Sequence, residues 1–424
     1  MTAKSPKKPY GIFTTFLLHL HPPMVDKSAI KFTRTFGLGG INALLFIILA
    51  ITGILLRFSY LPAPEHAYES ILNLQNQTFL GGLLRNLHHW SAKLMVVTAF
   101  LHLLRVFFTQ SIYFERKKNW YYGLLLFAIV LAFNFTGYLL PWDQLSFWAV
   151  TVVSNMPSYI PFIGDGLSNF LRGGPEVDGH TLLNFYNLHT SILPLLFVVM
   201  MSLHFYLVRK AKGVTVQNPE EREMVKVNPN LVIREALVAL ALFLGLLIFS
   251  MIFAAPLLDY ANPLLSPNPI KAPWYFAGMQ ELLIHIHPTL AILIVPLSLI
   301  GFLLWIPNQK INTQNIGKWF YNERGKSLLL YSSLLSAFFT FAIVLVNEYF
   351  LTEMLLSGPP LILGLVPFLL YIALTLGIIF FLQMKFKIDK IELFNALFSI
   401  IFCSYLILSI ISIYFRGINM ELIF

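Results

Sequence analysis

The sequence is poor in cysteine and in charged residues. Of its 424 residues, one is cysteine and 12% are Asp, Glu, Lys or Arg. A single cysteine, Cys403, excludes an internal disulfide, a Cys-ligated iron–sulfur cluster and a Cys-X-X-Cys-His attachment site. The scarcity of charge, with 57% hydrophobic residues and a mean hydropathy of +0.72, excludes an ordinary soluble protein. We therefore expect a polytopic membrane protein.

Nine stretches are apolar and long enough to cross a bilayer as helices, which predicts an all-α polytopic fold. They are 36–56, 87–108, 121–141, 186–208, 233–255, 289–306, 328–350, 360–383 and 393–415. The first 35 residues are basic and lack a small-residue cleavage pattern, so no cleavable signal peptide is expected. Residues 11–31 look more like an interfacial segment that precedes the first span.

The formal net charge of +9 follows membrane topology and does not indicate a nucleic-acid partner. With the N-terminus on the cytoplasmic (n) side, few Lys and Arg residues fall on the opposite (p) side. The p side holds Arg57, Arg85, Arg172, Lys271 and Arg416, and Lys93 lies within a span. The positive-inside rule therefore predicts this orientation. We expect the bacterial inner membrane as the location.

Four histidines form two pairs within the predicted spans, His88 with His102 and His189 with His204. The first pair is fourteen residues apart, which on a helix gives about 21 Å of rise and about 40° of rotation. The second is fifteen apart, which gives about 60°. Each helix therefore presents two imidazoles on one face. Two such helices predict two stacked haems with two histidines each, their irons about 20 Å apart.

Two other interpretations of these histidines stay open. They could be buried side chains that bond to helix neighbours, or they could relay protons in a non-redox transporter. Ionisable groups inside a membrane are costly, and four at matching spacings favour ligands. His89 is about 140° out of phase with His102, so His88 is the predicted ligand. Because the chain lacks the cysteines of a c-type site, the two haems should be non-covalent b-type haems.

Glycines recur at the same interval in the first and third spans. Gly39 and Gly53 are fourteen residues apart, and so are Gly123 and Gly137. A glycine lets a planar macrocycle approach the helix backbone. In step with the histidines, these pairs predict a four-helix bundle with two haem slots.

The chain divides into segments of different character. We expect a basic N-terminal interfacial segment at 1–35, a di-haem four-helix bundle at 36–212 and a polar n-side linker at 213–232. A second apolar block at 233–350 has no ligand-spaced histidines and carries a Pro-rich p-side loop. Additional transmembrane helices occupy 351–424.

Several segments resemble the cytochrome b family, and cytochrome b6 of the b6f complex most closely. The resemblance rests on RNLHHWSAKLMVVTAFLHLLRVF, FYNLHTSILPLLFVVMMSLHFYLVRK, GYLLPWDQLSFWAV and IPFIGDGLSNFLRGG. After the linker, ANPLLSPNPIKAPWYF resembles the start of the family's C-terminal domain, a separate subunit (subunit IV) in b6f that is fused here. The match covers about residues 30–345 and leaves the last two spans outside the b6f pattern.

The resemblance implies a subunit of a homodimeric quinol-oxidising complex. Quinol would be oxidised on the p side, with one electron passing to an external partner and the other across the membrane through the haems. His88 and His189 would ligate the p-side haem, and His102 and His204 the n-side haem. A Rieske protein or a multihaem c-type cytochrome would be the electron acceptor.

The resemblance also assigns residues around the haems and the quinol. Arg85 and Arg105 fall where the family places arginines beside haem propionates, with snorkelling at the interface as the alternative. The quinol site, within the 233–350 domain and the loop after span three, would be lined by Trp142, Phe147, Trp274 and Tyr275.

Two positions depart from the family pattern. Gly37 stands where b6f has the cysteine of its additional n-side haem, so such a haem should lack its covalent bond or be absent. Pro273 stands where the family's Pro-Glu-Trp-Tyr motif has its acid.

A titratable group is needed to carry a proton away from quinol, and Pro273 cannot do so. We expect a short helix from Trp274, on which Glu281 replaces the missing acid with a pKa raised by desolvation. Asp143 on the opposing loop is the rival. The alternative is that Glu281 is a solvated interfacial side chain.

A second function class remains at this stage, the b-type cytochrome subunit of a formate dehydrogenase or hydrogenase. Such proteins also pair histidines in a small bundle but lack the second apolar block and the Trp-Tyr-Phe loop. The sequence names neither the quinone nor the partner chains.

Overall fold

The computed structural model describes residues 23–215, 223–311, 315–351 and 360–423. Within these ranges, nine helical segments are long and apolar enough to span a membrane. They are Leu38–Arg57, Gly81–Phe108, Phe114–Leu139, Gly179–Lys210, Val227–Ile252, Leu290–Asn308, Glu323–Leu351, Gly364–Phe386 and Lys390–Tyr414. The predicted all-α polytopic fold is confirmed, although several spans begin one to two turns earlier than predicted.

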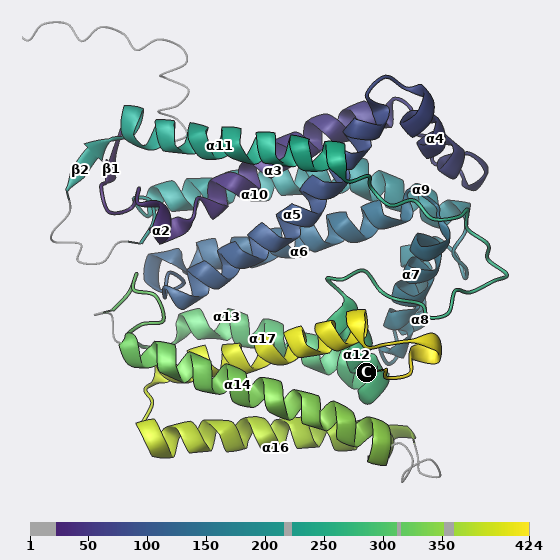
Figure 1. Ribbon diagram of the computed structural model, residues 1–424. Helices are drawn as coiled ribbons and strands as arrows, with labels where there is room; N and C mark the ends of the chain where they lie inside the picture. Colours follow the sequence, from purple (N-terminus) through teal and green to yellow (C-terminus); the bar gives the residue numbers. More distant parts are fainter. Residues whose placement is uncertain (1–22, 216–222, 312–314, 352–359, 424) are drawn as a thin grey trace, which may run out of the picture.

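The first layer of the molecule is a bundle around one apolar core (Figure 1). Its membrane helices are α3 (Leu38–Arg57), α5 (Gly81–Phe108), α6 (Lys117–Leu139) and α10 (Leu193–Lys210). Shorter helices lie together at one end, which is the p side by the predicted orientation. They are α4 (Pro64–Gln77), α7 (Gln144–Asn155), α8 (Gly164–Arg172) and α9 (Gly179–Asn187).

Helix α11 (Val227–Ile252) packs on this bundle, although it follows the linker in sequence. Leu246 joins the core shared by α3, α5, α6 and α10. Two side chains of α5 also bind its C-terminal end, since Asn86 Nδ2 donates to the Ser250 carbonyl and Trp90 Nε1 to the Phe253 carbonyl. The first helix of the second block is therefore attached to the bundle.

The second layer contains α12 (Ala277–His285), α13 (Val295–Trp305), α14 (Glu323–Val346), α16 (Pro360–Phe386) and α17 (Lys390–Tyr414) (Figure 1). The last helix, α17, contacts α12, α14 and α16. It also meets the bundle, because the rings of Phe398 and Phe107 stack with centroids 4.2 Å apart. Gln110 of the α5 end donates to Asn395 at 3.2 Å. The final helix thus belongs to the second layer and also contacts the bundle.

A polar seam joins α14 to α17. Ser336 Oγ lies 2.9 Å from the Ile400 carbonyl and 2.8 Å from Ser404 Oγ, and Thr340 donates to Ser404 at 2.8 Å. Small hydroxyl residues let two membrane helices approach closely and bond across the contact. The seam therefore adds hydrogen bonds to the apolar contacts that Leu328 and Val344 of α14 make with α17.

A two-stranded antiparallel sheet joins the N-terminal segment to the linker, at the end that is the n side by the predicted orientation. Strand β1 (Met24–Asp26) pairs with β2 (Met224–Lys226), and a single turn, α2 (Phe32–Thr35), follows β1. The predicted interfacial segment at 11–31 falls largely outside the described residues. The linker predicted at 213–232 is shorter, because α11 already begins at Val227.

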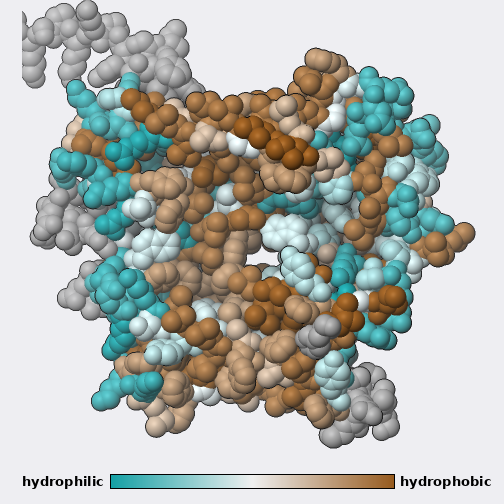
Figure 2. Space-filling view, viewed as in Figure 1, coloured by the Kyte–Doolittle hydropathy of each residue, from teal (hydrophilic) through white to brown (hydrophobic). Residues whose placement is uncertain are grey.

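The surface agrees with a membrane protein. Figure 2 shows a broad brown apolar band across the middle of the molecule, with teal polar residues at both ends of the helices. Exposed Ile47, Ile51 and Ile54 on α3 contribute to such a surface. An integral multi-pass membrane protein follows from this pattern and from the nine spans.

Candidate functional site

His88 and His189 face each other near the p-side end of the bundle. Their ring centroids are 6.3 Å apart and their planes make an angle of 67°. His88 Nδ1 lies 2.8 Å from Thr52 Oγ1 on α3. His189 Nδ1 lies 3.2 Å from Thr136 Oγ1 on α6 and 3.1 Å from the Phe133 carbonyl. Because these contacts engage Nδ1 of each ring, Nε2 is the nitrogen left for a metal.

Glycines leave room for the two rings of this p-side pair. A Cβ atom at Gly137 would lie 2.6 Å from His189 Cε1, closer than real Cβ atoms approach. A Cβ atom at Gly53 would lie 3.3 Å from His88 Cε1. A side chain at Gly137 would therefore displace the His189 ring.

The n-side pair has a similar ring spacing and also lies beside two glycines. The ring centroids of His102 and His204 are 6.5 Å apart, with planes at 72°. A Cβ atom at Gly39 would lie 3.6 Å from His102 Cε1, and one at Gly123 would lie 3.6 Å from His204 Cε1. The structure thus pairs His88 with His189 and His102 with His204, and it places one of the four glycines beside each histidine.

The spacing of each pair suits a haem iron. An iron between two imidazoles separates the rings by two metal–nitrogen bonds of about 2 Å each plus the two ring radii. Centroid separations of 6.3 Å and 6.5 Å match that sum. In the part of the chain that the structure describes, no three or more His, Cys, Asp or Glu residues form a metal site. A two-histidine site fits a metal whose remaining ligands come from a macrocycle.

A π-helical turn at Leu188–Ile192 carries His189 into the α10 span. Pro194, the second residue after this turn, lacks the backbone N–H that a regular helix would bond. The wider turn accommodates one extra residue. It thereby compensates for the fifteen-residue interval between His189 and His204, compared with fourteen on α5.

Arg85 and Arg105 are both buried on α5. Arg85 donates to the carbonyls of Ala255 and Pro256, at 2.9 Å and 2.6 Å, just beyond α11. Arg105 Nε donates to the Arg34 carbonyl at 3.1 Å. Neither guanidinium snorkels to an exposed surface, and their predicted role beside propionates stays a prediction.

The loop after α6 places Trp142 and Phe147 in a buried apolar cluster, with ring centroids 5.4 Å apart. Asp143 caps α7, because its Oδ1 accepts from the Ser146 N–H at 2.9 Å. Its Oδ2 accepts from the Leu258 N–H at 3.2 Å. The carboxylate of Asp143 therefore joins the α7 loop to the segment after α11.

The second p-side loop brings Tyr275 against the bundle. Its side chain is buried beside the α5 and α6 core, whereas Trp274 remains 40% exposed. The neighbouring Phe276 meets Phe135 of α6 with centroids 6.0 Å apart. Tyr405 of α17 donates to the Tyr275 carbonyl at 2.8 Å. Phe135 also packs against the cluster of Trp142 and Phe147, so the two predicted quinol loops approach each other.

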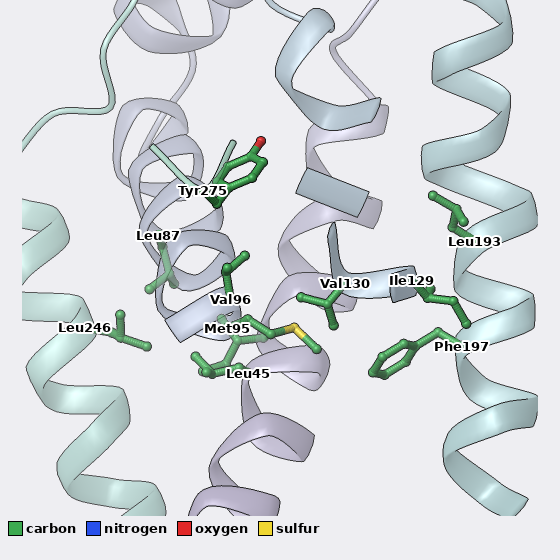
Figure 3. Close-up of a cluster of buried hydrophobic side chains, with 11 residues drawn as sticks. Leu45, Leu87, Met95, Val96, Ile129, Val130, Leu193, Phe197, Leu246 and Tyr275 are labelled. Carbon is green, nitrogen blue, oxygen red and sulfur yellow. The ribbon is translucent and has the colours of Figure 1, made fainter. Parts of the chain in front are cut away.

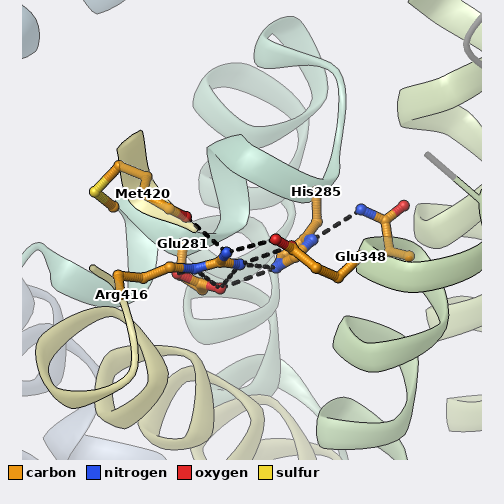
Figure 4. Close-up of polar contacts among 6 residues, drawn as sticks. Glu281, His285, Glu348, Arg416 and Met420 are labelled. Carbon is orange, nitrogen blue, oxygen red and sulfur yellow. Dashed lines mark hydrogen bonds and ion pairs between the residues drawn. The ribbon is translucent and has the colours of Figure 1, made fainter. Parts of the chain in front are cut away.

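Glu281 differs from expectation in two respects. It is fully buried, so the solvated alternative is wrong, and α12 begins at Ala277 rather than Trp274. Arg416 Nη2 lies 2.6 Å from its Oε1, and His285 Nε2 lies 3.0 Å from the same atom (Figure 4). Burial alone would raise the pKa of Glu281, but the hydrogen bonds and charges of His285 and Arg416 lower it below its ordinary value.

The predicted upward shift of the Glu281 pKa is therefore wrong, because the sequence did not reveal its partner. Arg416 follows α17 and also binds Glu348 at 3.0 Å. Burial alone would lower the pKa of Arg416, but Glu281 and Glu348 raise it. The cluster joins residues that are 135 positions apart in the chain.

Sequence reasoning missed Thr52 and Thr136, which bond the p-side histidines. The sequence did contain a signal, because each threonine directly precedes one of the glycines that lie beside these histidines. Thr52 precedes Gly53, and Thr136 precedes Gly137. The two Thr-Gly doublets place a hydroxyl and a bare backbone position on adjacent residues of the same helix.

Comparison with known proteins identifies relatives of the bundle. The family model described as cytochrome b/b6/petB matches residues 25–212. Cytochrome b6 of Synechococcus sp. (strain JA-3-3Ab) is 41% identical over 193 residues, which is 44% of this chain and 90% of that protein. Cytochrome b6 of Synechococcus elongatus (strain ATCC 33912 / PCC 7942 / FACHB-805) is 43% identical over 173 residues, covering 41% of this chain and 80% of that protein.

The likeness of fold extends beyond the bundle. A solved structure titled hyperthermophilic respiratory Complex III superimposes with a TM-score of 0.66 at 23% sequence identity. The match covers 89% of this chain and 98% of that one, so the fold likeness includes the second layer. With the coverage of the cytochrome b6 sequences, these findings show that the chain belongs to the cytochrome b family.

Proposed function

We propose that this chain is the cytochrome b subunit of a complex that oxidises quinol on the p side of the membrane. Electrons would cross the membrane through two b haems, each bound by two histidines. The observation that carries this proposal is the pair of histidine sites, with ring separations of 6.3 Å and 6.5 Å on the same bundle. The cytochrome b6 relatives support it.

In this proposal, His88 and His189 hold the p-side haem, and His102 and His204 hold the n-side haem. A haem iron supplies reversible one-electron transfer. Thr52 and Thr136 fix the rings of the p-side ligands by bonding Nδ1, which keeps Nε2 directed into the slot.

Around these ligands, Gly39, Gly53, Gly123 and Gly137 leave the slots open. Arg85 and Arg105 are the candidates for pairing with propionates. Both lie on α5, the helix that carries His88 and His102.

Quinol would bind between the two p-side loops. Trp142, Phe147 and Tyr275 are buried aromatic residues in this region, and Trp274 is partly exposed. Aromatic walls with a few polar groups suit a planar ring with oxygen substituents. Contact of both loops with Phe135 on α6 supports one shared site.

Glu281 and Asp143 are the candidate groups for moving protons from quinol. A carboxylate paired with Arg416 and with a lowered pKa is a weak proton acceptor, so any role of Glu281 requires the pair to open. Asp143 is held by two backbone N–H groups. Normal quinol oxidation with an unchanged pH profile in Glu281→Gln would remove Glu281 from the mechanism.

The complex around this chain is also part of the proposal. We place the N-terminus on the n side of a bacterial inner membrane, from the distribution of Lys and Arg. A homodimer within a larger assembly is expected, with a Rieske protein or a multihaem c-type cytochrome as electron acceptor. No nucleic-acid partner is proposed.

Membership of the cytochrome b family sets aside the transporter and the formate dehydrogenase or hydrogenase subunit. The function is tested by adding a quinol to the purified complex and recording the visible spectrum. Reduction of b haem supports the proposal. A complex whose b haem is reduced by dithionite but by no quinol would contradict it.

A further inference from the structure

Lys93 is a cation inside a membrane span that the mechanism above does not use. It is half-buried on α5, five residues beyond His88 and about 140° around the helix from that ligand. It therefore faces away from the haem slot. Its Nζ lies 5.6 Å from the centroid of the Tyr138 ring and 5.3 Å from that of the Tyr275 ring.

These two aromatic rings are the contacts that the structure gives the Lys93 ammonium. Among the described residues, no carboxylate pairs with it. Cation–π contacts compensate only in part for the loss of water around an ammonium group. A lysine at membrane depth without a counter-ion is therefore a candidate binding group.

The Tyr275 hydroxyl is a second incompletely satisfied group at the same place. The side chain is 7% exposed, and its oxygen is buried without a hydrogen-bond partner in the described part of the chain. Figure 3 shows the ring above Leu87 and Val96 of α5, with its oxygen directed away from these apolar side chains. Burial, and then Tyr138, raises the pKa of Tyr275, so the hydroxyl keeps its proton and can donate.

An unbonded hydroxyl and an unpaired ammonium are both costly to bury. Both are satisfied at once by a ligand that places an oxygen between them. The nearby rings of Tyr138, Tyr275 and Phe276 offer faces and edges to an aromatic ligand. Figure 2 also shows an opening between the two layers of the molecule, on the side of α6 that faces α12 and α17 in Figure 1.

We propose that Lys93 binds a ring oxygen of the quinol or quinone, together with the Tyr275 hydroxyl. This inference rests on the proposed function and adds a binding residue to its p-side site. The ammonium and the hydroxyl donate to the same oxygen and fix the orientation of the ring between Tyr138 and Tyr275. The cation also stabilises negative charge that develops on that oxygen.

The role of Tyr405 follows from the same geometry. Its hydroxyl donates to the Tyr275 carbonyl at 2.8 Å, so α17 holds the backbone that carries the Tyr275 side chain. Tyr405 acts through Tyr275 and is a positioning residue.

The test compares Lys93→Met, Lys93→Arg and Tyr275→Phe with the wild type in the purified complex. The matched control is Lys118→Met, which removes an exposed lysine at the n-side start of α6. The readouts are KM and kcat with a short-chain quinol, and the Kd of an unreactive quinone analogue from the shift it causes in the haem spectrum. Dithionite-reduced spectra report whether each variant retains both haems.

We expect Lys93→Met to raise KM and the analogue Kd about tenfold or more, because it removes a charge-assisted hydrogen bond. Lys93→Arg, which keeps the cation, should recover part of that loss. Tyr275→Phe should weaken analogue binding several-fold and keep its haems, since the lost hydroxyl has no protein partner. The Lys118→Met control should match the wild type.

Unchanged KM and analogue Kd in both Lys93→Met and Tyr275→Phe would overturn the inference and leave the proposed function intact. If Lys93→Met does not assemble, an unchanged analogue Kd in Tyr275→Phe alone overturns it, because the two groups are proposed to bind one oxygen. A wild-type complex whose haems no quinol reduces would overturn both the inference and the proposed function.

Discussion

At the residue scale, the p-side histidines depend on a hydroxyl and a bare backbone position from neighbouring helices. Thr52 and Gly53 serve His88, and Thr136 and Gly137 serve His189. The threonine fixes the ring through Nδ1, and the glycine leaves space beside the ring. Both requirements are met by two consecutive residues on one helix, so each doublet can be tested one residue at a time.

Gly137→Ala should remove the p-side haem and leave the n-side haem in place. The new Cβ would lie 2.6 Å from His189 Cε1, so the ring must move out of line with His88. Haem content and the reduced spectrum of the purified variant measure the loss. Gly40→Ala is the control, because nothing lies within 4 Å of its Cβ. Two intact haems in Gly137→Ala would contradict this account of the slot.

Thr52→Val should keep the p-side haem but bind it less tightly. The substitution preserves volume and removes the hydroxyl 2.8 Å from His88 Nδ1. Loss of such an orienting partner costs about 10- to 100-fold in metal affinity. Haem transfer to apomyoglobin measures the release rate. Thr98→Val on α5 is the control, because the Thr98 hydroxyl bonds Asn42 instead of a histidine. Equal rates of haem release from the two variants would argue against an orienting role for Thr52.

At the scale of elements, periodicity and spacing predicted the nine spans and the pairing of the two histidine helices. They could not predict the π-helical turn at Leu188–Ile192, which depends on Pro194 and on the packing of α10. They also did not predict that α17 of the second layer contacts the bundle. The position of α17 depends on contacts between distant residues, such as Phe107 with Phe398 and Glu281 with Arg416.

The ion pair between Glu281 and Arg416 should hold α12 against the end of α17. Arg416→Met leaves the buried Glu281 carboxylate without its arginine partner, and loss of one member of a buried ion pair costs about 3–5 kcal/mol in comparable cases. We expect a lower Tm in detergent, and a partial recovery in the double variant with Glu281→Gln, which removes the stranded charge. A Tm unchanged by Arg416→Met would show that the pair does not stabilise the α12 contact.

The same cluster should make the stability of the protein depend on acid pH. The folded-state pKa of Glu281 is lowered, so its contribution is present above the ordinary Glu pKa and is lost as pH falls through the lowered value. As pH is lowered, the Tm of the wild type should therefore fall more steeply than the Tm of Glu281→Gln. Glu421→Gln, an exposed acid in the same C-terminal segment, is the control and should follow the wild type. If the Tm of the wild type and that of Glu281→Gln fall in parallel with pH, the lowered pKa of Glu281 is contradicted.

At the scale of the whole molecule, the two layers have different parts in the proposed function. The bundle carries both histidine pairs, and the second layer supplies the Tyr275 loop that closes against it. The family match covers the bundle, whereas the second layer is matched by fold. In this arrangement, the proposed quinol site lies where the two layers meet.

The two haem sites should be separable. His204→Ala removes one ligand of the n-side pair and leaves His88 and His189 untouched, so the n-side haem should be lost while the p-side haem remains. Quinol should still reduce the remaining haem. His180→Ala, an exposed histidine on the p side, serves as the control. Loss of both haems in His204→Ala together with a folded chain would mean that the sites are not independent.

The central claim is that this chain holds two b haems, each between two histidines of one bundle. The most direct measurement is the ratio of haem to polypeptide in the separated chain, determined after extraction of the haem into acidified acetone. The chain must be separated under conditions in which it keeps its haem. The account predicts two haems per chain, both fully extractable, because Cys403 is the only cysteine. A ratio of one, or haem that stays covalently attached to the polypeptide, would contradict it.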